Sequence, residues 1–127
     1  MIELKYFGHS TFLVDLGDKT ILFDPFISPN PLASDIEIDK ITTDFVLVSH
    51  GHEYHVFDVE RIVNNNEATL VSNFEIVTWF KNRGIKKVFG MNHGGAKDFD
   101  FGTVKYVNAV HSSSLPDGSY GGNPGGF

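Results

Sequence analysis

The chain has 127 residues, enough for one globular domain, and it is 41% hydrophobic and 20% charged, a composition that excludes a disordered protein. The net charge of −6 argues against general nucleic-acid binding, which requires a basic surface. Cysteine is absent, so disulfide bonds are excluded and any bound metal needs histidine and oxygen ligands.

The N-terminus and the hydropathy pattern bear on where the protein acts. The opening segment MIELKYFGHS has neither the long apolar core nor the small-residue cleavage site of a signal peptide. No apolar run in the sequence approaches the roughly 20 residues that a membrane-spanning helix needs. We therefore expect a cytoplasmic protein without a membrane partner.

The first part of the chain predicts an antiparallel β-meander. Three segments alternate polar and apolar residues, as strands with one buried face do, namely residues 1–7, 11–16 and 19–23. Gly17 and Asp18 form a hairpin turn signal between the last two strands. Asp24 and Pro25 end the meander, and the Pro-, Ser- and Asn-rich segment up to Ser34 predicts a loop.

The middle of the chain predicts strands that alternate with helices. The apolar spacing within residues 56–64 is that of a helix packed on one face, and Asn73 is a good N-cap for a second helix. The predicted strands of this βαβαβ unit are residues 45–49, 69–72 and 87–89, and the predicted helices are residues 56–64 and 74–82. This order predicts an α/β (α+β) domain with a mixed sheet.

The last part of the chain predicts a β-hairpin followed by a long irregular tail. The hairpin consists of residues 99–101 and 103–110, on either side of Gly102. The tail, residues 112–127, carries turn signals almost throughout, and we expect no helix or strand in it. Residues 1–127 are therefore predicted to form a single domain.

Three histidines lie close together in the segment FVLVSHGHEYH, where His50, His52 and His55 follow a predicted buried strand directly. Imidazole is a common metal ligand, and a short loop between two rigid elements can bring such rings to one point. The alternative is a polar loop that is rich in histidine by chance. Because α/β proteins place their sites at the carboxyl ends of strands, we favour a metal site.

His111 repeats this placement, since it also ends an apolar strand and begins a polar loop. We expect the side chains of His50, His52 and His111 to converge on one metal ion, with His55 nearby. On its own, His111 would be an ordinary loop histidine. Its significance comes from the match with His50.

Two further residues are candidates to orient a metal-bound imidazole, a task that carboxylates often perform. His9 lies between two predicted strands, and Asp24 ends the strand ILFD. The alternatives are a turn histidine and an aspartate that starts a turn before proline. His93, in a glycine-rich loop, is predicted to be an ordinary loop residue.

Other motif signals are weak. Gly94 and Gly95 fit neither of the phosphate-binding patterns GxxxxGK[ST] and GxGxxG. Ser112, Ser113 and Ser114 lack the G-x-S-x-G context of a nucleophilic serine. The sequence therefore identifies no catalytic side chain, and metal-bound water is the expected nucleophile.

The histidine motif resembles that of the metallo-β-lactamase superfamily. The family motif H-x-H-x-D-H corresponds to residues 50–55, HGHEYH, and His111 occupies the place of a third zinc-binding histidine. The segments FGHSTFLV, ILFDPFISPNPLA, NFE, MNHGG and VNAVHSSS resemble one branch of it, the small bacterial metal-dependent hydrolases related to L-ascorbate-6-phosphate lactonase. The resemblance covers essentially the whole chain in order.

This resemblance implies an αββα sandwich of two similar halves, of which the chain covers the N-terminal half. It implies that His50, His52 and His111 hold a first divalent metal, and that His55 and the aspartate of the motif help to hold a second. Zinc is expected, and manganese, iron or nickel are alternatives. The metal would activate water to hydrolyse a small-molecule substrate, whose identity the scaffold does not fix.

Two departures from the family pattern affect these expectations. Tyr54 stands where the family has its aspartate, and a phenol with a pKa near 10 is mostly neutral at pH 7 and a poor substitute. The second half of the fold, which supplies a bridging aspartate and a further histidine, would follow Phe127. We therefore expect impaired activity of this chain alone. The alternatives are a non-catalytic half-domain and a metal-binding protein without catalysis.

A half-sandwich would also leave one sheet face without its covering layer. Each large apolar side chain left exposed forfeits roughly 1.5–3 kcal/mol, against a net stability of about 5–15 kcal/mol. We therefore expect a homo-oligomer or a complementing C-terminal half. The residues expected on this face include Phe12, Val14, Phe45, Leu47 and Val107.

Overall fold

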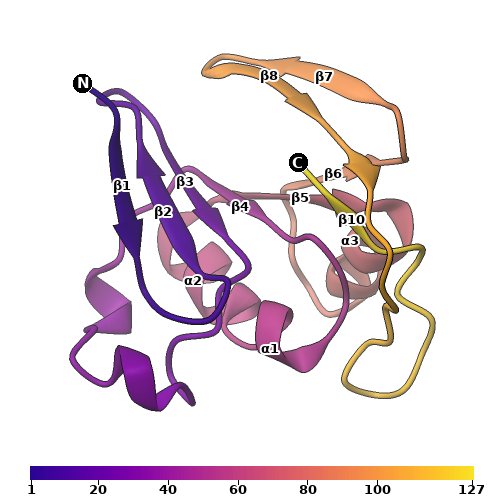
Figure 1. Ribbon diagram of the computed structural model, residues 1–127, viewed down its shortest axis with the longest axis horizontal. Helices are drawn as coiled ribbons and strands as arrows, with labels where there is room; N and C mark the ends of the chain where they lie inside the picture. Colours follow the sequence, from indigo (N-terminus) through magenta and orange to yellow (C-terminus); the bar gives the residue numbers. More distant parts are fainter.

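The computed structural model describes residues 1–127 and contains one six-stranded sheet with the strand order β1-β2-β3-β4-β5-β6 (Figure 1). The first three strands pair in antiparallel fashion, and β3 to β6 pair in parallel. The predicted meander and βαβαβ unit are therefore confirmed. The strands are β1 (Glu3–Tyr6), β2 (Phe12–Asp15), β3 (Thr20–Phe23), β4 (Phe45–Leu47), β5 (Thr69–Asn73) and β6 (Val88–Met91).

Helices cover one face of this sheet (Figure 1). They are α1 (Glu53–Val56), α2 (Val59–Asn66) and α3 (Phe74–Asn82), and two 3-10 helices, η1 (Pro31–Ala33) and η2 (Ile38–Lys40), lie in the loop between β3 and β4. The main core of 18 buried residues joins strand residues such as Val46 to helix residues such as Phe80. The prediction of α3 and of its N-cap Asn73 is confirmed. None of the helices combines the length and hydropathy that crossing a membrane requires.

The helix predicted over residues 56–64 is confirmed for residues 59–64, which lie in α2, and is wrong at its start, because Phe57 and Asp58 separate α1 from α2. The backbone N–H of Asp58 donates to the carbonyl oxygen of Pro25 at 3.1 Å. Its buried carboxylate accepts from the backbone N–H groups of Ile27 at 2.6 Å and Ser28 at 2.9 Å. Asp58 thus forms hydrogen bonds with the backbone of the loop after β3, and the helix is interrupted there. Short acidic side chains often compete with helix formation in this way.

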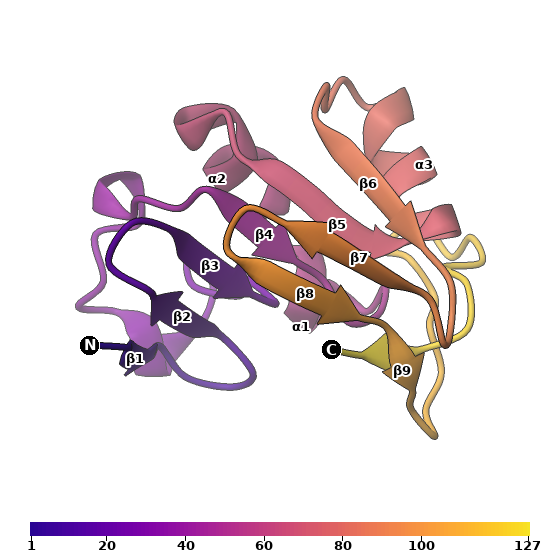
Figure 2. The same cartoon turned by 90° about the horizontal axis from the view of Figure 1, so that it is seen from above.

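A β-hairpin covers part of the opposite sheet face (Figures 1 and 2). It consists of β7 (Ala96–Phe99) and β8 (Gly102–Lys105), so the first strand begins and ends earlier than predicted. Phe99 and Phe101 pack against Phe45 with ring centroids 5.3 and 4.6 Å apart. A second core of six buried residues, including Leu47 and Tyr106, lies under this hairpin.

The expectation that this face lacks a covering layer is therefore wrong for Leu47, which is only 1% exposed. Phe12, Val14 and Phe45 are half-buried, and Val107 is exposed. The hairpin supplies part of the layer that the sequence pattern assigned to a second half. The expected oligomer or complementing half stays a prediction.

The tail is also more ordered than predicted, since it contains the short strand β10 (Gly125–Gly126), paired with β9 (Val107–Asn108). A Cβ atom on Gly125 would lie 2.1 Å from Cζ of Tyr106, so only glycine allows this approach. The N–H of Gly125 donates to the carbonyl oxygen of Ser49 at 3.1 Å. The tail thus returns to the end of β4, and glycine strands carry no hydrophobic pattern that predicts this.

The Asn73 side chain gives a test of how much the tail contributes to stability. Its amide oxygen accepts from the N–H of Ile76 at 2.9 Å, and its NH₂ group donates to the carbonyl oxygens of Gly121 at 2.8 Å and Asn123 at 3.3 Å. Asn73→Ala removes the cap and both tail contacts, and we expect it to cost about 2–3 kcal/mol. Asn73→Ser keeps a cap acceptor and should recover about 1 kcal/mol. Urea unfolding measures both values, and equal losses would contradict a separate role for the cap.

Candidate metal centre

The three predicted first-metal histidines meet at the carboxyl end of β4. His50 and His52 come from the loop after this strand, and His111 comes from the segment after β9. One nitrogen of each ring lies within 4.8 Å of the others. Ligands of a single zinc ion at about 2.0–2.1 Å lie within about 4.2 Å of one another. The three nitrogens would therefore need to move only slightly closer together to coordinate a single ion.

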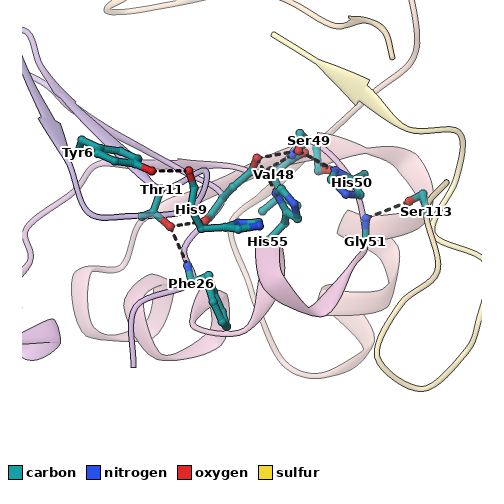
Figure 3. Close-up of polar contacts among 12 residues, drawn as sticks. Tyr6, His9, Thr11, Phe26, Val48, Ser49, His50, Gly51, His55 and Ser113 are labelled. Atoms are coloured by element: carbon teal, nitrogen blue, oxygen red, sulfur yellow. Dashed lines mark hydrogen bonds and ion pairs between the residues drawn. The ribbon is translucent and has the colours of Figure 1, made fainter. Parts of the chain in front are cut away.

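The buried hydroxyl of Ser113 connects the two segments that carry these histidines (Figure 3). Its Oγ accepts from the N–H of Gly51 at 2.9 Å and donates to the carbonyl oxygen of Gly121 at 2.8 Å. A Cβ atom on Gly51 would lie 3.2 Å from the Leu115 side chain, so the segments are closely packed. This contact explains why His111, far along the chain, approaches His50.

Asp24 anchors the other side of the site. Its carboxylate accepts from the N–H and the hydroxyl of Ser49, both at 2.7 Å, and contacts Nδ1 of His55 at 3.0 Å. Asp24 is buried and adopts a φ of 44°, a left-handed conformation that aspartate tolerates better than most residues. The carboxylate thus contacts an imidazole of the motif, and its role in orienting a metal-bound ring stays a prediction.

The environment of His50 fits a metal ligand. Its Nδ1 lies 2.9 Å from Oγ of Ser49, while its Nε2 is buried and has no hydrogen-bond partner. Such an unpaired buried group costs roughly 1–3 kcal/mol, and a metal ion at this nitrogen would offset the cost. The donor set of three imidazoles also suits zinc and similar ions.

Metal binds the neutral form of imidazole, and the surroundings of His50 and His52 favour that form. Burial, followed by charge repulsion from the neighbouring rings of His55, His52, His111 and His9, lowers the pKa of His50 from 6.5 to about 3. Burial, followed by repulsion from His111 and His55, also lowers the pKa of His52.

His55, His9 and Tyr54 lie outside the group formed by His50, His52 and His111. The His55 ring is 4.0 Å from the His50 ring between centroids, outside the three-nitrogen group. His9 packs edge-on against His55 at 4.9 Å, and its ring makes no hydrogen bond. Tyr54 is 57% exposed and packs against Phe26 at 5.1 Å and His9 at 6.0 Å. The rings of His9, Tyr54 and Phe26 thus form an aromatic cluster beside His55.

His93 lies outside the three-nitrogen group, and its Nε2 contacts the carbonyl oxygen of Pro124 at 2.9 Å. Ser49 and Ser113 are not predicted as site residues by the sequence, because they lie in a predicted strand end and a predicted irregular loop. The available signal was a hydroxyl residue directly before His50 and another two positions after His111.

The sheet, its helical layer and the histidines at its strand ends define an α/β protein of the metallo-β-lactamase-like fold. The family model for the beta-lactamase superfamily domain matches residues 3–123. The chain therefore belongs to the beta-lactamase superfamily, and the predicted superfamily and fold class are confirmed.

Individual relatives agree with this assignment. The chain is 49% identical over 126 residues to a UPF0173 metal-dependent hydrolase of Flavobacterium johnsoniae, and 48% identical over 126 residues to one of Methylacidiphilum infernorum; each match covers 99% of this chain and 56% of the relative. The solved structure of Igni18, a metallo hydrolase from Ignicoccus hospitalis, matches with a TM-score of 0.81 and 30% identity, covering 98% of this chain and 54% of that one. The chain spans about half the length of these relatives.

The lowered pKa of His50 predicts how the stability of the metal-free chain depends on pH. With a pKa of about 3 in the folded state and 6.5 as the ordinary value, this imidazole is neutral at intermediate pH when folded and protonated when unfolded. Unfolding then takes up about one proton, so the unfolding free energy falls by about 1.4 kcal/mol per pH unit as the pH decreases from about 6 to about 4. His50→Asn should remove this share of the slope in urea titrations. Equal slopes in both proteins would contradict the lowered pKa.

Tyr54 predicts a weakened second metal position, because an exposed neutral phenol stands where the motif has a carboxylate. Tyr54→Asp should raise the metal content per chain by about one ion, with the C-terminal half of the Flavobacterium johnsoniae relative supplied. Elemental analysis after dialysis measures this, and Tyr54→Asn controls for side-chain size without charge. Equal metal content in wild type and Tyr54→Asp would contradict the prediction, and a loss in Tyr54→Phe would identify the phenol as a ligand.

Proposed function

We propose that the protein is a metal-dependent hydrolase whose metal is held by His50, His52 and His111. The observation that carries this proposal is the buried, unpartnered Nε2 of His50 within a group of three histidine nitrogens. The names of the relatives, metal-dependent hydrolase and metallo hydrolase, support it. Zinc is the first candidate metal, and manganese, iron or nickel suit the same donors.

Each residue of the site has a proposed task in this reaction. A divalent ion here supplies a Lewis acid that polarises a substrate oxygen and lowers the pKa of water. His50, His52 and His111 hold the ion as neutral imidazoles, and the pKa shift of His50 keeps it in that form. Asp24 fixes the ring of His55 through the 3.0 Å contact with Nδ1. These tasks need no nucleophilic side chain.

The substrate is proposed to be a small molecule. The resemblance to the branch related to L-ascorbate-6-phosphate lactonase makes lactones and phosphoesters the first bonds to test, with thioesters and other esters next. Phe26 and Tyr54 pack against each other and against His9, whose ring packs against His55 on one side of the site. We propose that the substrate approaches along this side, where the second metal position of the family lies.

Tyr54 favours one alternative, a metal-binding half-domain without catalysis. A neutral phenol in place of the carboxylate leaves His55 without its partner for a second ion. In that case the chain binds one metal and hydrolyses nothing on its own. The two candidates differ in activity and agree in metal binding.

Metal binding and hydrolysis measured on the same samples test the proposal. His50→Ala and His111→Ala should each weaken zinc binding by about 100-fold or more, because each removes a ligand. His93→Ala removes a histidine outside the cluster and should leave zinc affinity unchanged. Wild type should hydrolyse at least one substrate in a panel of lactones, phosphoesters and esters.

Two outcomes would contradict the proposed function. Zinc binding that depends on the cluster, without hydrolysis across the panel, would support the metal-binding half-domain. Zinc affinity equal in wild type, His50→Ala and His111→Ala would overturn both candidates.

A further inference from the structure

The Ser49 side chain lies between the carboxylate of Asp24 and the ring of His50. Figure 3 shows Ser49 beside His50. Its Oγ is 2.7 Å from Oδ2 of Asp24 and 2.9 Å from Nδ1 of His50. The Ser49 N–H donates to Oδ1 of Asp24 at 2.7 Å, and its carbonyl oxygen accepts from the Tyr106 hydroxyl at 2.8 Å. Ser49 is therefore held on both sides of its backbone.

The direction of these hydrogen bonds follows from the chemistry of the groups. A carboxylate accepts and cannot donate, so the single hydroxyl hydrogen of Ser49 points to Asp24. The hydroxyl oxygen must then accept from His50, which places a proton on Nδ1 of that ring. In a neutral imidazole the other nitrogen, Nε2, keeps its lone pair. That nitrogen is the buried atom without a partner.

We propose that Ser49 is a positioning residue that relays the charge of Asp24 to His50 and fixes the tautomer whose Nε2 faces the metal. This inference rests on the proposed function for the metal, while the tautomer itself does not depend on it. The hydrogen-bonded partner of a metal-binding histidine sets its ring orientation and raises its basicity as a ligand. Ser49 thereby couples the ring of His50 to the negative charge of Asp24 through its hydroxyl group.

The same carboxylate oxygen also serves His55. Oδ2 of Asp24 lies 3.0 Å from Nδ1 of His55 and 2.7 Å from Oγ of Ser49. Asp24 therefore orients one imidazole directly and the other through a hydroxyl. Loss of Ser49 should change His50 and leave the contact between Asp24 and His55 in place, which separates the relay from a general loss of structure.

The tautomer of His50 in the metal-free chain is the direct test. Two-bond ¹H–¹⁵N spectra of protein with labelled histidine, recorded near neutral pH, distinguish Nδ1-protonated from Nε2-protonated rings. We expect Nδ1–H for His50 in wild type and in Ser49→Thr, which keeps the hydroxyl. Ser49→Ala should lose this preference, while His55 keeps Nδ1–H. An Nε2-protonated His50 in wild type would overturn the relay, whether or not any variant folds.

Zinc affinity supplies the second readout. Ser49→Ala should weaken zinc binding by about 10–100-fold, the usual effect of removing the partner of a metal-bound histidine. Ser49→Thr should bind zinc as wild type does. Ser114→Ala removes an exposed hydroxyl near the site and is the matched control. Unchanged affinity in Ser49→Ala would overturn the role in metal binding, whereas absent binding in wild type would refute the proposed function and leave the tautomer as the test of the relay.

Discussion

The buried carboxylate of Asp24 is the interaction on which the rest of the site depends. It lies at the end of β3 and bonds the Ser49 backbone and hydroxyl after β4, and the His55 ring of α1. One side chain thus joins three segments that carry or support the candidate ligands. Without this carboxylate, the loop after β4 would lose its hydrogen bonds to Asp24, and His55 would lose its partner. These contacts also offset the cost of the positive φ of Asp24.

A second set of contacts closes the site from the other side. Ser113 binds the backbone of Gly51, Tyr106 and Gly125 both donate to the carbonyl oxygen of Ser49, and the glycines of the tail allow these approaches. The histidine loop is therefore held between Asp24 and the tail. This enclosure buries His50 and keeps its imidazole neutral, which is the form that the proposed metal site requires.

Much of this arrangement could be predicted from the sequence because it follows from local pattern. The strand ends at His50 and His111, the meander and the cap at Asn73 all have signals within a few residues. The break at Asp58 and the strand of Gly125 and Gly126 had no such signal, since each depends on a partner distant in sequence. The bonds of Ser49 had only one, a hydroxyl residue directly before His50, and their partners are also distant. Hydroxyls and glycines give no periodicity, so their roles emerge only when the chain is folded.

We propose that His50, His52 and His111 form one metal site, and anomalous diffraction from crystals grown with zinc tests this arrangement. We expect one strong anomalous peak about 2.0–2.1 Å from a nitrogen of each of the three rings, with Nε2 as the His50 ligand. A peak held by His55 and His9 without His50, or no ordered zinc at the end of β4, would contradict it.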